Sequence, residues 1–196
     1  MDIEKLMTDY PYRIILGSAS PRRQELLKSL GFKFTVKPVN ADEDFPEHLE
    51  AHEIPVYLAE HKAAGYPKKL HDNELLITAD TIVWCDGKVF NKPADFEEGK
   101  KMLNELSGRM HEVFTAVCLK SAHKQACFYD TSRVYFKKFT DEEISYYLLH
   151  YQPYDKAGGY GVQDWLGYIG IEKIEGSFYN VMGLPVKQLY EALSAF

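Results

Sequence analysis

The sequence predicts an α/β or α+β protein in which helices pack on the faces of a large mixed β-sheet. Apolar runs typical of strands alternate with helical segments along the 196 residues, and capping residues or prolines stand where helices should begin. The chain is 45% hydrophobic, which is enough to bury a substantial core, and it contains neither repeats nor low-complexity linkers. We therefore expect one domain.

The first strand, loop and helix are the clearest elements. Residues 13–16 predict a strand that ends at Gly17, and Ser20-Pro21 supplies the N-cap and first position of a helix running to about Leu30. Further along we expect a strand at residues 32–38, an acidic loop at residues 42–53, a helix from Pro55 to about Ala64, and strands at residues 75–79 and 81–85, with a break at Asp80.

The second half continues the alternation. Asp86-Gly87 predicts a tight hairpin turn into residues 88–90, since these residue types tolerate positive φ. We expect strands at residues 113–119, 126–136 and 168–174, and helices that begin at the capping boxes Asp95-x-x-Glu98 and Thr140-x-x-Glu143 and after Pro185.

Ser18, Arg22 and Arg23 are the first candidate binding residues. A helix N-terminus carries partial positive charge and favours carboxylates, yet this helix begins with two arginines. A bound phosphate would reverse that penalty, because free backbone N–H groups, hydroxyls and forked guanidinium groups converge there. The alternative is a solvated helix start at which Ser20 only caps. We favour an anion site.

Asp80 is the only ionisable residue between Leu75 and Cys85. A carboxylate inside an apolar strand is costly unless it meets water, a metal or a base, so Asp80 is a candidate general base or metal ligand. The alternative is an aspartate that turns the chain. Lys62, on a short helix, and Lys92, held by Pro93, are candidate phosphate contacts, although single lysines are most often solvated.

Two further segments can bind ligands. Glu43 lies in the acidic run at residues 42–44, which can offer oxygen ligands to Mg²⁺ or can simply be solvated. Gln163 follows the glycine-rich residues 158–161, and its amide can read the edge of a base through both a donor and an acceptor. This segment lacks the spacings of dinucleotide and P-loop motifs.

Composition argues against several classes of protein. The net charge of −6 disfavours a protein that coats nucleic acid. Three cysteines without C-x-x-C spacing predict buried, reduced thiols of a cytoplasmic protein. Neither a signal peptide nor an apolar run of membrane-spanning length is visible. No Gly-x-Ser-x-Gly elbow occurs, so we expect His111 to orient a loop or begin a strand with its ring hydrogen-bonded.

A strand followed by Ser-x-Ser-Pro-Arg-Arg resembles the opening of the Maf family of nucleoside triphosphate pyrophosphatases. The resemblance continues in ordered blocks along nearly the whole chain: Asp42-Glu43, Ala59-x-x-Lys62-Ala63, Ala79-Asp80-Thr81, Lys92-Pro93, Leu106-Ser107-Gly108, His111-x-Val113-x-Thr115, residues 157–163 and residues 176–185. It implies the fold of Maf proteins and the related inosine triphosphatases: an elongated mixed sheet in two lobes with a central cleft. It also implies a single catalytic domain over residues 1–196 and a cytoplasmic homodimer.

The resemblance implies roles for individual residues. Thr81, directly after Asp80, is typical of the branch that cleaves dTTP and UTP. The resemblance implies that Asp80 is the general base and that the phosphates are bound by Ser18, Arg22, Arg23, Lys62 and Lys92. It implies that base preference is set by Arg22, Thr81 and Gln163. It also implies that a divalent cation, Mg²⁺ or Mn²⁺, is bound by Glu43 and Asp80. The chain departs from the family pattern at Gly17, where many relatives have alanine, and at Asp164-Trp165, where a small residue is usual.

The implied reaction is attack of water on the α-phosphorus of a nucleoside triphosphate, with release of pyrophosphate and a nucleoside monophosphate. A phosphate site alone would equally suit a nucleotide-sensing regulator of septum formation that acts through protein contacts, or a phosphotransferase with another acceptor. Asp80 together with Lys62 and Lys92 favours hydrolysis. We expect neither stable nucleic-acid binding nor membrane association.

Overall fold

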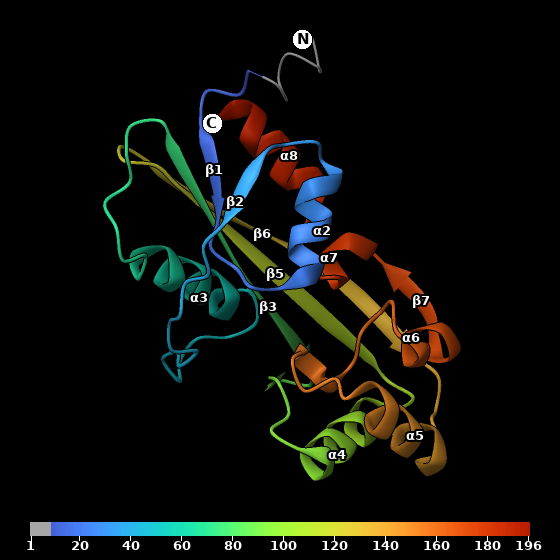
Figure 1. Ribbon diagram of the computed structural model, residues 1–196. Helices are drawn as coiled ribbons and strands as arrows, with labels where there is room; N and C mark the ends of the chain where they lie inside the picture. The colour runs from blue at the N-terminus through green and yellow to red at the C-terminus, as the bar shows by residue number, and fades with distance from the viewer. Residues whose placement is uncertain (1–8) are drawn as a thin grey trace. The chain divides into compact units, whose positions relative to one another are not determined.

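The computed structural model describes residues 9–196 and contains one mixed sheet with strand order β2-β1-β3-β5-β6-β7 and β4 beside β3 (Figure 1). β1 is parallel to β2 and β3, whereas β4 and β7 pair antiparallel with β3 and β6. The predicted α/β class is confirmed. The expectation of no signal peptide rested partly on residues 1–8, which lie outside the part of the chain that the structure describes. None of the helices in that part is long and apolar enough to span a membrane.

The strands are β1 (Arg13–Leu16), β2 (Phe34–Val36), β3 (Glu74–Cys85), β4 (Lys88–Phe90), β5 (Met110–Lys120), β6 (Gln125–Phe136) and β7 (Ile171–Glu175). The helices are α2 (Pro21–Ser29), α3 (Glu53–Ala64), α4 (Phe96–Leu106), α5 (Asp141–Tyr151), α6 (Trp165–Gly170), α7 (Phe178–Val181) and α8 (Val186–Ala195), with a short 3₁₀ turn η1 (Ala157–Gly159).

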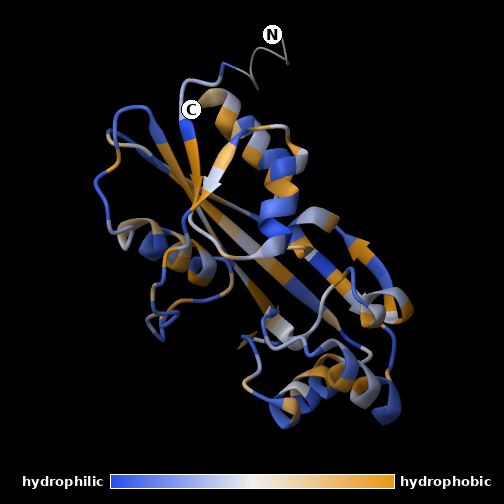
Figure 2. Cartoon of the chain, in the orientation of Figure 1, coloured by the Kyte–Doolittle hydropathy of each residue, from blue (hydrophilic) through white to orange (hydrophobic). Residues whose placement is uncertain are grey.

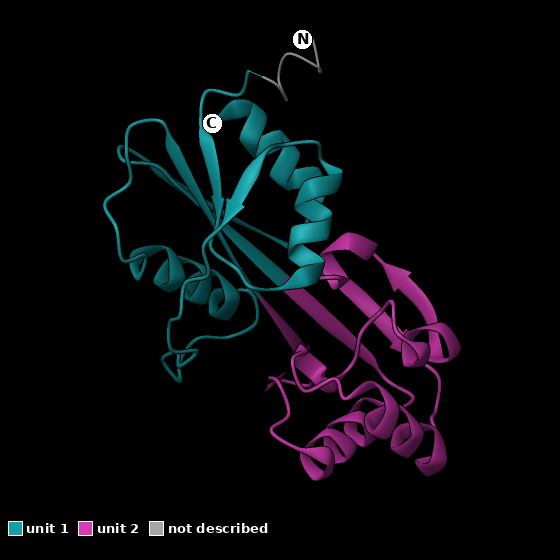
Figure 3. Ribbon diagram, in the orientation of Figure 1, with its two compact units in different colours: residues 1–80, 115–130, 183–196 teal, residues 81–114, 131–182 magenta. Residues whose placement is uncertain are grey.

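The chain divides into two compact units (Figure 3). Unit 1 contains residues up to Asp80 with residues 115–130 and 183–196, and unit 2 contains residues 81–114 and 131–182. β3, β5 and β6 each contribute residues to both units. Two lobes were predicted, and each unit has its own hydrophobic core. The cleft stays a prediction.

In unit 1, apolar residues along β1 and β3 form the core that the helices cover (Figure 2). Ile15 and Leu76, which are paired across these strands, share a cluster with Ala59 of α3. The residues next to Ile15 and Leu76 along each strand point away from α3, and Figure 1 shows α2 and α8 on that opposite side. Phe32, just after α2, packs its ring on Tyr190 of α8, with centroids 6.4 Å apart.

In unit 2, α4 and α5 bury their apolar residues against the ends of β5 and β6. Both helices begin where predicted. The side chain of Asp95 accepts from the Glu98 N–H, and Thr140 and Glu143 form a complete capping box. The hairpin turn at Asp86-Gly87 also forms as predicted, with both residues at positive φ.

Several predicted boundaries were wrong. β2 covers only Phe34–Val36 of the expected residues 32–38, and β5 begins at Met110 rather than at residue 113. β3 is a single strand without a break at Asp80. α3 begins at Glu53, two residues before Pro55, which still lies in the first turn where no helical N–H is needed. Residues 168–170 belong to α6, where the Tyr168 N–H donates to the Asp164 carbonyl at 3.1 Å, and only Ile171–Glu175 is a strand.

His111 lies near the start of β5 with its ring hydrogen-bonded, as predicted. The ring is 1% exposed, and its Nε2 lies 2.7 Å from the hydroxyl of Tyr160. Burial lowers the pKa of His111 from 6.5 to about 3, because the charged imidazolium would lose its hydration. The ring is therefore neutral in the folded protein at ordinary pH.

We predict that His111 makes the protein less stable as the pH falls. Between its unfolded pKa of 6.5 and its folded pKa of about 3, the unfolded chain binds a proton that the folded chain does not. The free energy of unfolding should therefore decrease by up to about 1.4 kcal/mol per pH unit in this window. Urea unfolding of wild type and His111→Gln at pH 7, 6 and 5 checks this. The wild type should lose stability relative to the variant as the pH falls, and a pH-independent difference would contradict the lowered pKa.

Candidate active site

The loop between β1 and α2 has the predicted form. Ser20 caps α2 by accepting a hydrogen bond from the Arg23 N–H, and Pro21 occupies the first helical position. No acidic residue lies in the first turn. The partial positive charge of this helix N-terminus therefore adds to that of Arg22 and Arg23, which suits an anionic ligand.

Gly17 explains one departure from the family pattern. A Cβ at this position would lie 2.9 Å from the Thr78 methyl carbon and 3.2 Å from Val39 Cγ2. The Gly17 N–H donates to the Ile77 carbonyl at 2.8 Å, so the chain follows β3 closely here. Glycine fits this close approach, and an alanine would need Thr78 and Val39 to shift.

Arg23 forms hydrogen bonds that sequence reasoning missed. Its Nη1 donates to the Ala79 carbonyl at 2.8 Å and its Nε donates to the Gly183 carbonyl at 2.9 Å. Burial lowers the pKa of Arg23, although the charge of Asp80 opposes this. Arg23 thus fixes the backbone directly before Asp80. No local signal in the sequence could reveal this, since Gly183 lies 160 residues away.

Asp80 and Lys62 form a buried ion pair. Lys62 Nζ lies 2.5 Å from Asp80 Oδ1, and the two side chains are only 12% and 9% exposed. Glu43 Oε1 lies 3.3 Å from the same ammonium group. Thr78 helps to place Lys62, because its hydroxyl donates to the Ala59 carbonyl at 2.7 Å and so ties β3 to α3. The structure brings together these three predicted residues from separate segments.

The unbroken strand at Asp80 has a physical reason. β1 pairs with β3 from Glu74 to Ile77 and β4 pairs with it from Val83 to Cys85, so Asp80 lies between the two pairings. The prediction of a break assumed that the backbone must be interrupted for the carboxylate to meet water, a metal or a base. Instead Lys62 neutralises it, and the backbone remains extended.

Glu43 and Asp80 fit a divalent cation that the substrate would share. Mg²⁺ is commonly held by one or two carboxylates with substrate phosphates and water. Both carboxylates approach Lys62, and Glu43 is 47% exposed. Within residues 9–196, no three His, Cys, Asp or Glu side chains cluster as a metal centre. The pair therefore does not fit a cation held by protein ligands alone.

Thr81, Lys92 and Gln163 belong to unit 2. Thr81 continues β3, and Lys92 follows β4. The Asn91 carbonyl accepts from the Gly158 N–H at 3.1 Å, so the glycine-rich loop is held beside the chain at Lys92. Gln163 Oε1 is buried and has no hydrogen-bond partner among the described residues. A buried acceptor without a partner destabilises the folded protein until a ligand or water satisfies it, so Gln163 is suited to contact a ligand.

Comparison with known proteins decides the family. Residues 13–196 match the family model described as Maf-like protein. This chain belongs to the Maf-like family. It is 52% identical over 186 residues to a dTTP/UTP pyrophosphatase of Parabacteroides distasonis, an alignment that covers 94% of this chain and 96% of the relative. It is 51% identical to a dTTP/UTP pyrophosphatase of Phocaeicola vulgatus, with 93% and 95% covered. A solved structure of the Staphylococcus aureus Ham1 protein has a TM-score of 0.42 and 13% identity, over 63% of this chain and 71% of that one.

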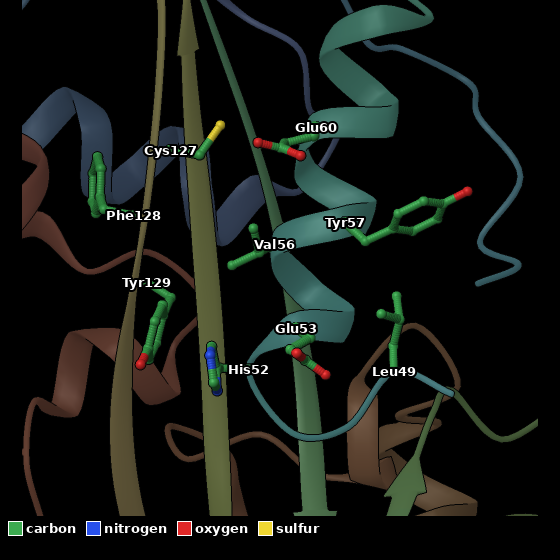
Figure 4. Close-up of a pocket in the computed structure, with 9 residues that line it drawn as sticks. All are labelled: Leu49, His52, Glu53, Val56, Tyr57, Glu60, Cys127, Phe128 and Tyr129. Atoms are coloured by element: carbon green, nitrogen blue, oxygen red, sulfur yellow. The ribbon is translucent and has the colours of Figure 1, made fainter. Parts of the chain in front are cut away.

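A separate hollow in this Maf-like chain lies outside the predicted site. It has a volume of about 430 Å³ and lies in unit 1 between α3 and β6. Figure 4 shows its lining residues, including Val56 and Glu60 of α3 and Cys127 of β6. None of the residues predicted to bind phosphate, base or metal lines it. The hollow is therefore not part of the candidate active site.

We predict that Arg23→Lys destabilises this Maf-like protein. A single ammonium group cannot reproduce the two hydrogen bonds to the Ala79 and Gly183 carbonyls, so the loss should be about 1–3 kcal/mol. Arg13→Lys is the control, because that side chain is 67% exposed and its replacement should change stability by less than about 0.5 kcal/mol. Urea unfolding measures both. Equal effects of the two substitutions would contradict the positioning role of Arg23.

Proposed function

We propose that this chain is a nucleoside triphosphate pyrophosphatase that hydrolyses dTTP and UTP to the nucleoside monophosphate and pyrophosphate. One observation supports this most strongly: the buried Asp80 carboxylate pairs with Lys62 in the same unit as a helix N-terminus that bears two arginines. Two relatives named dTTP/UTP pyrophosphatase are 52% and 51% identical to it over 96% and 95% of their own length. A regulator that only senses triphosphates would not need the buried carboxylate.

The phosphates would bind at the start of α2. Ser18, Arg22, Arg23, Lys62 and Lys92 are the proposed phosphate ligands. Arg23 also donates to two main-chain carbonyls and so positions Asp80. Hydrolysis of an anhydride depends mainly on positioning and charge neutralisation, and the cationic groups of unit 1 are suited to both.

Asp80 is the proposed general base. Its Oδ1 accepts a hydrogen bond from Lys62, which leaves the other oxygen to accept a proton from the attacking water. The water oxygen bonds to the α-phosphorus, the bond from that phosphorus to the bridging oxygen breaks, and pyrophosphate leaves with the electron pair. Lys62 offsets the negative charge that the phosphates bring to the site when the substrate binds. Base preference would come from Arg22, Thr81 and Gln163.

A divalent cation is part of the proposal, held by Glu43 and Asp80 together with the substrate. When bound, Mg²⁺ or Mn²⁺ would neutralise phosphate charge and acidify a bound water. We further propose that residues 1–196 act as one catalytic domain, as a homodimer in the cytoplasm, without binding nucleic acid stably.

Release of pyrophosphate tests the reaction. Purified protein with Mg²⁺ is expected to release pyrophosphate, and no orthophosphate, from dTTP and UTP, and EDTA should abolish the release. ATP, GTP and CTP serve as comparison substrates. Pyrophosphate from all five at equal rates would contradict the base preference. Absence of release from every triphosphate would overturn the proposed function.

Asp80→Asn tests the assignment of the base. The amide keeps the size of the side chain and can still accept from Lys62, but it cannot take a proton from water. We expect kcat for dTTP to fall by about 100-fold or more. Circular dichroism and the melting temperature check that the variant is folded. A folded variant with near-normal turnover would remove Asp80 from this role.

A further inference from the structure

Tyr147 of α5 joins two points of the loop that leads to Gln163. Its side chain is completely buried in unit 2, and its hydroxyl donates to Asp164 Oδ2 at 2.8 Å. The Tyr147 hydroxyl oxygen also accepts a hydrogen bond from the Gly161 N–H at 3.0 Å. Burial and the negative charge of Asp164 raise the pKa of Tyr147, so this hydroxyl keeps its proton and remains a donor.

Asp164 is unusual for a residue at the start of a helix. It occupies the N-cap of α6, where an aspartate normally accepts from the first helical N–H groups. Here the side chain makes no capping hydrogen bond. Its carboxylate instead contacts Tyr147, and Lys156 Nζ lies 3.7 Å from it. The local capping hydrogen bond is thus replaced by a contact with another helix.

Glycine at position 161 makes this arrangement possible. A Cβ on Gly161 would collide with the Asp164 carboxylate. The loop is also held further back, where the Tyr160 hydroxyl meets His111 and the Gly158 N–H meets the Asn91 carbonyl. The residues on both sides of Gln163 are thus fixed in unit 2.

The residue between these fixed points carries a hydrogen-bond acceptor without a partner. Gln163 Oε1 is buried without a hydrogen-bond partner among the described residues. Thymine and uracil carry an N3–H donor, whereas cytosine has an unprotonated N3 and an amino group. An acceptor fixed opposite N3 would bond the N3–H of thymine and uracil but would face the N3 lone pair of cytosine, while a mobile amide could rotate and offer its NH₂ group to cytosine N3.

We propose that Tyr147, together with Asp164, is a positioning residue that holds Gln163 in the orientation that favours thymine and uracil over cytosine. This inference rests on the proposed function. It assigns a purpose to Asp164, which departs from the family pattern at this position. Base selection, and not the hydrolytic step, is what these two residues govern.

Four variants test the proposal. Tyr147→Phe retains the buried ring and removes only the hydroxyl, and Asp164→Ala removes its partner. Asp164→Asn keeps an acceptor for Tyr147 and is the rescue variant. Tyr151→Phe is the matched control, because Tyr151 lies on the same helix, stacks on Tyr147 with centroids 5.2 Å apart and is 42% exposed.

The readout is the ratio of kcat/KM for dTTP to that for dCTP, with the melting temperature measured in parallel. Tyr147→Phe and Asp164→Ala should each lower this ratio about tenfold, mainly by raising KM for dTTP, with kcat nearly unchanged. Asp164→Asn and Tyr151→Phe should keep the wild-type ratio. The double variant Tyr147→Phe with Asp164→Ala should be no worse than the poorer single variant, because both remove the same interaction.

An unchanged ratio in folded Tyr147→Phe would overturn the proposal, even if its melting temperature fell. An equal loss of kcat with every substrate would also overturn it, since that result indicates a general structural defect. Calorimetric titration of the same proteins with dTMP and dCMP measures base selection without turnover. An inactive wild type that still prefers dTMP, with the preference lost in Tyr147→Phe, would refute the proposed function but support the positioning role.

Discussion

The ion pair between Lys62 and Asp80 is the interaction on which the candidate site depends. Two charges with side chains about nine-tenths buried are tolerated only because each compensates the other. The surrounding bonds keep them aligned: Thr78 ties β3 to the helix of Lys62, and Arg23 ties the residue before Asp80 to the segment before α8. Removing either charge would leave the other without its nearest partner in a largely buried position, so stability and chemistry are coupled at this point.

The two units differ in the interactions that they contribute. Unit 1 concentrates cationic groups around one buried carboxylate, which suits a polyanion whose charge changes during the reaction. Unit 2 holds a glycine-rich loop through hydrogen bonds with the Asn91 carbonyl, the His111 ring and the Tyr147 hydroxyl. Neutral partners of this kind give rigidity, and rigidity is what a group that distinguishes similar bases requires.

The acidic character of the protein is compatible with this arrangement. With a net charge of −6, the chain has no extended basic field, so attraction of a triphosphate must come from a few placed groups. Arg22 and Arg23 form such a local positive region at a helix N-terminus that has no acidic residue in its first turn. Glu43, close to Lys62 and half exposed, is the proposed ligand of a cation that accompanies the nucleotide.

The sequence by itself determined the local structure and the family. Caps at Ser20 and Thr140, the turn at Asp86-Gly87 and the ordered motifs were readable because they depend on neighbouring residues. Tertiary structure alone decided the continuity of β3 and the acceptors of Arg23, and it decided that the Asp164 carboxylate bonds Tyr147 rather than capping its own helix. These features arise from contacts between residues 17 to 160 positions apart, whose energies outweigh local preference and leave no periodic trace in the chain.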